Sequence, residues 1–214
     1  MKITYLGHAC FKIQGRDVQV VTDPFRGVGL PEPRAEADLV LCSHGHDDHS
    51  YVGQTAKPDA RILVGFVGET EYAGVPVRGI KSFHDEAGGS KRGTNSIYVF
   101  KVDDMSLCHL GDLGHELPQD TMSAIGRVDV LFVPVGGFFT IGPREASRVV
   151  DQISPRVAIP MHFRTPRHSR MFDVLSTVED FLSLRDRVRR TESSEVEFDP
   201  ESLPEPTEIV VLQS

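Results

Sequence analysis

Three histidines and two aspartates fall within the six residues from His44 to His49, directly after the apolar run from Leu39 to Cys42. The order of side chains is H-x-H-x-D-H. Neutral imidazoles and ionised carboxylates are the ligands that zinc and similar metals accept, and closely spaced histidines are typical of zinc motifs such as H-E-x-x-H. A polar loop with solvated histidines is the alternative. Ligand-type side chains packed this densely favour a metal site.

The spacing of the cluster predicts how its ligands divide. If residues 38–43 form a buried strand, His44 and His46 stand two apart in an extended turn and point to the same side, so one metal can take both imidazoles. Asp47 and Asp48 are typical of the start of a short helix or turn, where acidic side chains complement the helix dipole. This change of direction carries Asp48 and His49 toward a second metal, as two-metal hydrolytic sites require.

Four apolar runs of the chain each end in a candidate ligand. They are 39–42 before His44, 77–83 before His84, 107–110 before Asp112 and 157–161 before His162. Binding sites of α/β folds collect at the carboxyl ends of strands, so four such ends at one edge would assemble a single site. Taken alone, His84 and His162 are compatible with ordinary structural histidines, and Asp112 with a turn residue. The cluster at 44–49 favours the ligand interpretation, because its metals need partners from elsewhere in the chain.

Further segments resemble one known family. The opening KITYLGHACF at 2–11, Thr22-Asp23-Pro24, Gly111-Asp112 and Pro160-Met161-His162-Phe163, together with the histidine cluster, resemble the landmarks of the metallo-β-lactamase superfamily of metal-dependent hydrolases. The likeness covers nearly the whole chain and points to the branch of small hydrolases similar to ascorbate-6-phosphate lactonase and N-acylphosphatidylethanolamine phospholipase D. It implies an α/β fold, a four-layer αββα sandwich of two mixed β-sheets with helices on the outer faces, as a single domain over residues 1–214.

The resemblance also implies a ligand set. It assigns His44, His46 and His84 to a first metal, Asp48, His49 and His162 to a second, and Asp112 to a bridging position. The cofactors would be two divalent metal ions, with zinc expected and manganese, nickel or iron as alternatives. A metal-bound hydroxide would attack the substrate, and Asp48 would be the catalytic residue that orients this hydroxide.

Three further side chains are candidates for supporting the metals or the substrate. His8 follows Gly7 in the first turn and could approach the site from the N-terminal hairpin. His109, close before the bridging aspartate, is compatible with a supporting or a purely structural role. Asp23 resembles a family position whose carboxylate fixes the tautomer of a ligand histidine, and the alternative is an Asx turn before proline. The remaining His115 and His168 are expected to be ordinary surface or loop residues.

Basic residues near the ligands are candidates for binding an anion. Lys91 and Arg92 lie in the glycine-rich segment 88–93, and Arg164 and Arg167 follow His162. They could hold a phosphate or carboxylate by charge-assisted hydrogen bonds, and a solvated, mobile loop is the alternative. The segment 136–140, Gly-Gly-Phe-Phe-Thr, is expected to form a lip of the substrate pocket or a plain turn.

Composition narrows the class of protein. The 214 residues are 39% apolar and 25% charged, with a net charge of −8, which fits one folded domain and argues against non-specific binding to nucleic acid or anionic membranes. No apolar stretch has the length of a membrane span, and the N-terminus lacks a signal-peptide core, so we expect a cytoplasmic protein with a small-molecule substrate. A homo-oligomer is compatible with the sequence. Three isolated cysteines, Cys10, Cys42 and Cys108, are expected to be reduced and buried.

Apolar and alternating runs predict many short strands and few helices. Strands are expected at 3–6, 10–14 and 18–22 as an antiparallel meander, and then at 38–43, 61–65, 77–83, 96–102, 106–110, 129–135, 156–161 and 208–212. One helix should begin at Pro143, and a second should run to about residue 189 from a capping box formed by Ser176 and Glu179. The acidic stretch 191–206 should be a surface connection.

These features favour a binuclear metal-dependent hydrolase that acts on a small ester, lactone or phosphodiester. A ribonuclease or phosphodiesterase acting on nucleic acid is one alternative, although relatives of that kind carry RNA-binding additions and this chain is acidic. An iron-binding redox protein on the same scaffold is a second, and it would need a separate flavin partner. A non-catalytic sensor that keeps the site is a third. The ligands define the chemistry and leave the substrate open.

Overall fold

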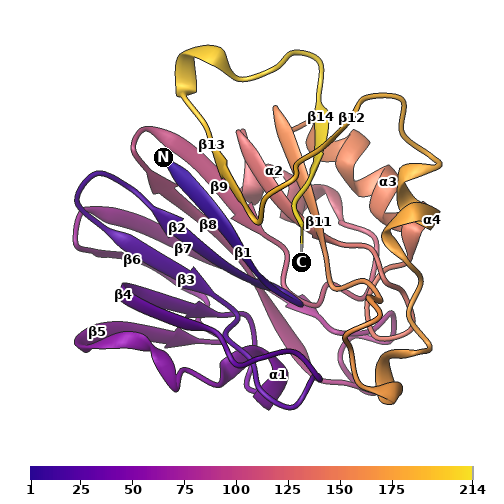
Figure 1. Cartoon of the computed structure of the whole chain (residues 1–214), viewed down its shortest axis with the longest axis horizontal. Helices are drawn as coiled ribbons and strands as arrows, with labels where there is room; N and C mark the ends of the chain where they lie inside the picture. Colours follow the sequence, from indigo (N-terminus) through magenta and orange to yellow (C-terminus); the bar gives the residue numbers. More distant parts are fainter. Residues whose placement is uncertain (214) are drawn as a thin grey trace.

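Two β-sheets face each other in the protein, whose computed structural model describes residues 1–213 (Figure 1). The six-stranded sheet has the order β13-β1-β2-β3-β4-β5, and the eight-stranded sheet has the order β12-β14-β11-β10-β9-β8-β7-β6. The strands of the first sheet are β1 (Lys2–Gly7), β2 (Cys10–Gln14), β3 (Gln19–Thr22), β4 (Arg34–Cys42), β5 (Gln54–Val64) and β13 (Glu195–Glu197). Those of the second are β6 (Gly68–Tyr72), β7 (Val75–Phe83), β8 (Thr94–Val102), β9 (Met105–His109), β10 (Val130–Pro134), β11 (Val157–Met161), β12 (Val188–Arg190) and β14 (Glu208–Val211).

Both sheets are mixed. In the first, β1, β2 and β3 form the expected antiparallel meander, and β4 and β5 continue it with parallel pairing. In the second, β6 to β9 pair antiparallel, while β9, β10, β11, β14 and β12 are parallel neighbours. The sandwich of two mixed sheets confirms the expected fold class.

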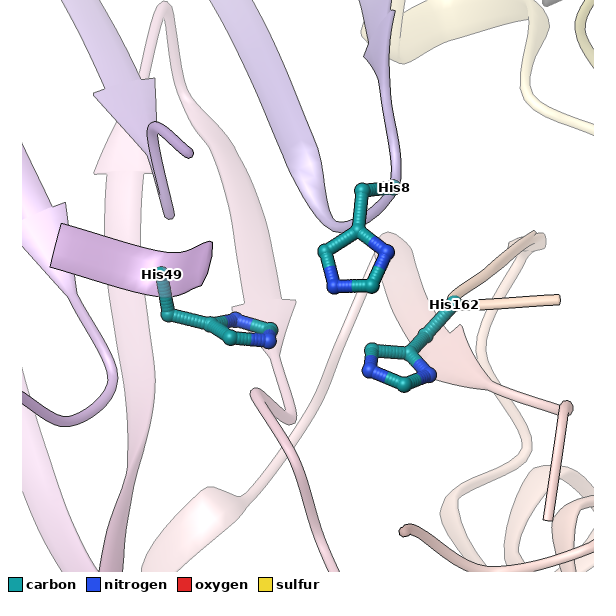
Figure 2. Close-up of side chains that lie close together, drawn as sticks. All are labelled: His8, His49 and His162. Carbon is teal, nitrogen blue, oxygen red and sulfur yellow. The ribbon is translucent and has the colours of Figure 1, made fainter. Parts of the chain in front are cut away.

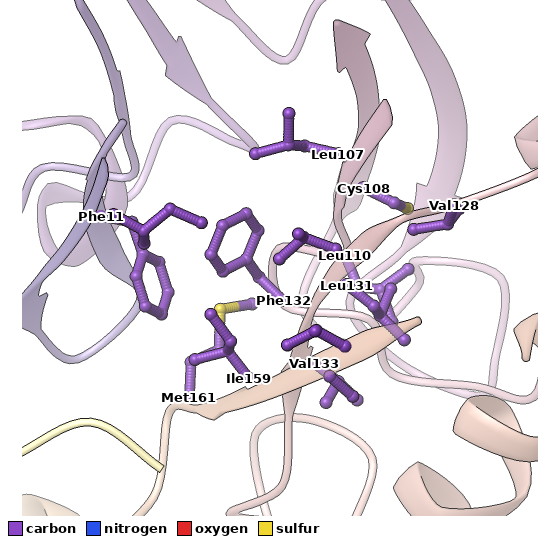
Figure 3. Packing of buried hydrophobic residues seen from close by; sticks show 14 of the residues in the cluster. Phe11, Leu107, Cys108, Leu110, Val128, Leu131, Phe132, Val133, Ile159 and Met161 are labelled. Atoms are coloured by element: carbon purple, nitrogen blue, oxygen red, sulfur yellow. The ribbon is translucent and has the colours of Figure 1, made fainter. Parts of the chain in front are cut away.

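The main core lies between the sheets and follows from the period of two along each strand. Val20, Leu39 and Leu41 of the first sheet belong to this core and are fully buried. Phe11 on β2 meets Phe132 on β10 across the interface, with ring centroids 4.4 Å apart (Figure 3). A buried phenylalanine of this kind contributes about 3 kcal/mol, so truncating either ring would loosen the contact between the sheets.

The outer layers differ between the two sheets. The helices are α1 (Asp47–Ser50), α2 (Gln119–Ile125), α3 (Pro143–Ile153) and α4 (Val178–Leu182), with 3-10 turns η1 (Arg170–Phe172) and η2 (Pro200–Ser202). Helix α3 packs on β10 through a buried face that begins at Ala146, and α2 packs on β7. On the other sheet, the alternate side chains Val21 and Val40 lie in a second core under Phe25 and Phe172, so a loop and η1 cover this face.

Several elements differ from the prediction. The second helix ends at Leu182 instead of near residue 189, and its capping box uses Thr177 and Asp180, one residue later than Ser176 and Glu179. The chain leaves the helix through 3-10-type bonds, and residues 188–190 instead join β14 as the edge strand β12. The stretch 191–206 is more than a connection, because it contains β13, which pairs with β1, and η2. Strand β6 and helix α2 had no periodic signal long enough to identify them.

Residues 1–213 contain neither a membrane-spanning helix nor a disulfide bond. None of the helices there is long and apolar enough to cross a membrane. The cysteines Cys10, Cys42 and Cys108 form no disulfide and are buried, as expected.

Candidate metal centre

The candidate ligands meet at one edge of the sandwich. Strands β7, β9 and β11 run in the same direction, so their carboxyl ends lie at one edge of the second sheet and are followed by His84, Asp112 and His162. Strand β4 of the first sheet ends just before His44, and α1 contains Asp48 and His49. The structure therefore brings together residues that are 118 positions apart in sequence, from 44 to 162.

Asp112 lies at the centre of the cluster. Its Oδ2 is 3.0 Å from His84 Nε2, 3.2 Å from His49 Nε2 and 3.5 Å from His162 Nε2. The ligand atoms of His44, His46 and His84 lie within 4.8 Å of one another, and so do those of His44, His49 and Asp112. The carboxylate of Asp112 therefore lies close to ring nitrogens of three candidate ligands that come from different parts of the chain.

Three imidazoles are oriented by hydrogen bonds from their Nδ1 atoms. His49 Nδ1–H donates to Asp23 Oδ2 at 2.8 Å, and His84 Nδ1–H donates to the carbonyl of Phe139 at 2.9 Å. His44 Nδ1 lies 3.0 Å from Ser43 Oγ, which itself donates to Asp23. Each ring thereby keeps Nε2 free and aimed at the centre, the arrangement by which proteins orient metal-binding histidines. The buried Nε2 atoms of His44 and His49 and the Oδ1 of Asp112 have no hydrogen-bond partner within residues 1–213.

Asp23 links the candidate ligand His49 to Ser43, the residue that follows β4. Its Oδ1 accepts the Ser43 amide at 2.6 Å, and its Oδ2 accepts the Ser43 hydroxyl at 2.7 Å as well as the His49 bond. The carboxylate is fully buried and bonds across 20 residues, whereas an Asx turn would bond within its own loop. This geometry supports the proposed role in fixing a tautomer.

His109 lies behind Asp23 and has a structural contact on each ring nitrogen. Its Nε2–H donates to the carbonyl of Ala9 at 3.0 Å, and its Nδ1 accepts the amide of Gly111 at 3.1 Å. Burial lowers the pKa of His109, in agreement with a neutral ring in this single tautomer. The residue holds the turn that leads into Asp112.

That turn requires glycine. Gly111 has φ +55°, and a Cβ there would lie 2.3 Å from Asn95 Oδ1 and 2.4 Å from Ser43 Cβ. Asn95 Oδ1 in turn accepts the amide of Asp112 at 2.9 Å. The backbone of the central aspartate is therefore fixed by close packing between the two sheets.

His8 enters the site from the first hairpin, beside His49 and His162 (Figure 2). Its ring is fully buried, and neither ring nitrogen has a hydrogen-bond partner within the described residues. The ring centroid lies 4.2 Å from that of His162, and Nε2 lies 3.8 Å from Asp48 Oδ2. The ligand atoms of His8, His49 and His162 lie within 4.8 Å of one another. His8 is therefore positioned to contact an ion or one of its ligands.

Some contributors had no sequence signal. Ser43 directly follows β4 and Asn95 lies on β8, and their hydrogen bonds link distant segments, which a sequence pattern does not reveal. His168 was expected to be an ordinary loop residue, yet its ring lies 5.7 Å from that of His8 and its Nε2 is buried. The hydrogen bonds of Thr165 to His168 Nδ1 turn the ring inward.

The basic candidates separate into two groups. Lys91 and Arg92 line a cavity of about 500 Å³ beside the cluster. Arg164 is exposed and forms a β-bridge with Thr177, so it does not line that cavity. Arg167 lines a different hollow, of about 740 Å³, which contains none of the candidate ligands.

The charges of the cluster suit metal binding. Burial raises the pKa of Asp112, but His162 and His49 outweigh it and hold the pKa well below its ordinary value, so the carboxylate is ionised. Burial and the neighbouring His49 lower the pKa of His44 to about 3, and burial lowers that of His162 to about 3. Burial alone would lower the pKa of His49, but Asp112 and Asp23 raise it. The ionised Asp112 and the neutral rings of His44 and His162 are donors that a divalent ion accepts, and such an ion would take the place of the protons that Asp112 favours on His49 and His84.

Comparison with known proteins defines the class. A family model described as a β-lactamase superfamily domain matches residues 2–162, and the chain belongs to the metallo-β-lactamase superfamily of metal-dependent hydrolases. Its relatives include a UPF0173 metal-dependent hydrolase of Pyrococcus horikoshii, 30% identical over 194 residues that cover 77% of this chain and 85% of that protein. Another, from Methanospirillum hungatei, is 34% identical over 188 residues, with 77% and 84% covered.

Solved structures agree with this assignment. A Thermotoga maritima protein assigned as a zinc-dependent hydrolase of the metallo-β-lactamase superfamily is 37% identical, with a TM-score of 0.82 over 99% of this chain and 97% of that one. A metal-dependent hydrolase from Parabacteroides distasonis has a TM-score of 0.66 at 17% identity, covers 99% of this chain and 93% of its own, and shows the shared fold alone.

Proposed function

We propose that this enzyme is a binuclear metal-dependent hydrolase of a small ester, lactone or phosphodiester. The observation that carries the proposal is the orientation of His44, His49 and His84, whose Nδ1 atoms are engaged by protein oxygens while their Nε2 atoms converge on the region of Asp112. Of these atoms, the buried Nε2 of His44 and of His49 have no hydrogen-bond partner within residues 1–213, and leaving such an atom unpaired costs about 1–3 kcal/mol.

The residues divide between two ions. His44, His46 and His84 would hold the first, since their ligand atoms lie within 4.8 Å of one another. Asp48, His49 and His162 would hold the second, with Asp48 Oδ2 3.9 Å from His49 Nε2 and with Asp112 between the two groups. Zinc is the proposed metal, since the donors are mainly imidazoles and the Thermotoga relative is assigned as zinc-dependent. Two bound ions would supply a water of lowered pKa and polarise the substrate oxygen.

Asp48 is the side chain proposed to act on the attacking water. It lines the cavity with His46 and His84, and although burial raises its pKa, His8 and His49 keep it below the ordinary value. An ionised carboxylate there can accept a hydrogen bond from the water and aim its oxygen. Hydrolysis joins that oxygen to the acyl carbon or phosphorus, breaks the bond to the alcohol oxygen, and leaves the alcohol with a proton.

The size of the cavity supports a small substrate. About 500 Å³ lie beside the candidate ligands, within the usual range for small-molecule sites. Phe139 and Phe172 give it apolar walls. Segment 136–140 thus contributes to the pocket through Phe139, which also orients His84 through its carbonyl.

Alanine substitutions test the proposal. We expect His46→Ala and His162→Ala to retain a cooperative unfolding transition, to lose bound metal, and to lose turnover of 4-nitrophenyl acetate, γ-butyrolactone and bis(4-nitrophenyl) phosphate. His115→Ala is the matched control, because this ring hydrogen-bonds only to the backbone of Phe83 and Glu116 within residues 1–213 and is not a candidate ligand. Full turnover in either ligand variant, or no turnover by the metal-loaded parent protein in the whole panel, would refute the hydrolase mechanism proposed.

A further inference from the structure

The cavity beside the metal centre has a cationic side. Its lining combines the candidate ligands with apolar and basic side chains, namely His46, Asp48, His84, Asp112, Lys91, Arg92, Gly93, Phe139, Met171 and Phe172. The two acidic residues, Asp48 and Asp112, face histidines of the cluster. These two carboxylates therefore interact with the histidine cluster and do not pair with Lys91 or Arg92.

Arg92 and Lys91 differ in how their charge is used. Lys91 Nζ forms an ion pair with Glu86. The guanidinium of Arg92 makes no ion pair and no side-chain hydrogen bond with any residue in 1–213, although the residue is half-buried. Its Cζ lies 5.6 Å and 5.7 Å from the ring centroids of Phe138 and Phe139. Aromatic contacts of this kind hold a guanidinium in place and leave its N–H donors free.

The loop that carries Arg92 is fixed by one buried carboxylate. Asp85 accepts the backbone amides of Ala87, Gly89, Lys91 and Arg92 at 2.8 to 3.0 Å. In addition, the amide of His84 donates to the carbonyl of Gly93 at 3.1 Å, which ties both ends of the loop to a candidate ligand. The mobile loop considered from the sequence is therefore an ordered turn that presents its arginine to the cavity.

We propose that Arg92 binds an anionic group of the substrate, a carboxylate or a phosphate, while the bond to be hydrolysed lies at the metal centre. This proposal rests on the proposed function and narrows its substrate class to small anionic esters, lactones or phosphodiesters. A planar guanidinium can make two parallel hydrogen bonds to either anion. Phe139 and Phe172 would contact the apolar part of the molecule between the two polar ends.

Anion binding to the zinc-loaded protein tests Arg92 without requiring turnover. Inorganic phosphate and acetate serve as probes in separate calorimetric titrations, so that the two sources of the anion are distinguished. We expect Arg92→Gln to weaken binding of at least one probe by about 10- to 100-fold, the range for a charged hydrogen-bonded contact, with unchanged metal content. Arg92→Lys should recover only part of this loss, because it keeps the charge and loses the planar pair of donors.

Lys91→Gln is the matched control, since it removes the same charge from the same loop at a side chain already paired with Glu86. We expect it to weaken binding by about threefold or less. Equal losses in the two glutamine variants, or unchanged binding in Arg92→Gln, would overturn the assignment of Arg92. Because binding is read directly, an anion site that depends on Arg92 in a protein without hydrolytic turnover would refute the hydrolase and leave the anion site standing.

Discussion

The backbone amide of His162 donates a hydrogen bond to the carbonyl oxygen of His8 at 2.9 Å. Both residues have a left-handed backbone, with φ of 53° at His162 and 55° at His8, which costs a side chain other than glycine about 1–3 kcal/mol. Tyr5 Oη donates to the same carbonyl at 2.9 Å. The first hairpin and the end of β11 thus hold each other in the conformations that turn both rings toward the metal centre.

Replacing His8 should weaken metal binding without unfolding the chain. His8→Asn suits the test, because asparagine tolerates a left-handed backbone and removes the imidazole. We expect metal affinity to fall by about 10- to 100-fold, as for other groups that support ligands. Competition with a chromophoric chelator measures the affinity, with His115→Asn as the control. Parental affinity in His8→Asn would show that this ring contributes nothing to the ions.

Gly111→Ala should destabilise the protein strongly, although it adds only one methyl group. The added Cβ would meet Asn95 and Ser43 at a residue with φ +55°, so we expect a loss of at least about 1–3 kcal/mol in the free energy of unfolding. Gly45→Ala is the matched control, because no atom lies within 4 Å of its added Cβ. Urea unfolding compares them, and similar midpoints for the two variants would contradict the packing described at Asp112.

Removing metal should lower thermal stability. Ligands that bind only the folded state stabilise it by about 4 kcal/mol at 1,000 times Kd, which corresponds to roughly 10 °C for a chain of this size. We therefore expect dialysis against a chelator to lower Tm by about this amount, and zinc or manganese to restore it. Calorimetry before and after reloading measures the change. An unchanged Tm would contradict coupling between the ions and the fold.

The metal-free protein should lose stability as the pH falls below about 6.5. Five histidines have lowered pKa values, namely His8, His44, His109, His162 and His168, while His49 and His84 have raised values. A histidine whose pKa is lowered by folding takes up its proton more readily in the unfolded chain. The free energy of unfolding therefore decreases as the pH falls from about 6.5, the histidine pKa in the unfolded chain, to about 3. The two raised groups act in the opposite direction and are outnumbered. Urea midpoints at pH 7.5, 6 and 5 check the sign, and a rising midpoint on acidification would contradict it.

Asp85 should control the order of the loop that carries Arg92. Burial raises the pKa of Asp85, but the four backbone amides outweigh this effect and lower the pKa to about 2. The stabilisation by the ionised Asp85 carboxylate is therefore complete above the ordinary pKa of an aspartate and is lost only as the pH falls through about 2. We expect Asp85→Ala to increase hydrogen exchange at residues 87–92 and to weaken anion binding at neutral pH, with unchanged exchange in β10. Parental protection of these amides would show that the loop is ordered by other contacts.

The sequence predicted the strands near the ligands because each combines an apolar run with a polar end. Leu39 to Cys42 before His44 is such a case, and the observed β4 ends at Cys42. The helix expected to reach residue 189 shows the limit, since Val188 to Arg190 pair with β14, a tertiary contact that outweighs local helix preference. Arg92 and Arg164 had equal standing from sequence position alone. The structure distinguishes them by their local backbone contacts. Asp85 fixes the loop that carries Arg92, whereas Arg164 forms a β-bridge with Thr177.

Strand β13 closes the edge of the first sheet with residues that come almost last in the sequence, Glu195 to Glu197 beside Lys2 to Thr4. Until those residues have been synthesised, the emerging chain exposes β1 as an open edge with free backbone donors and acceptors. Such edges promote association between unfinished chains. The first strand of the nascent chain therefore stays unpaired on this side until residues 195–197 have been made, and a chain halted before residue 195 should aggregate even though every candidate ligand has already been made.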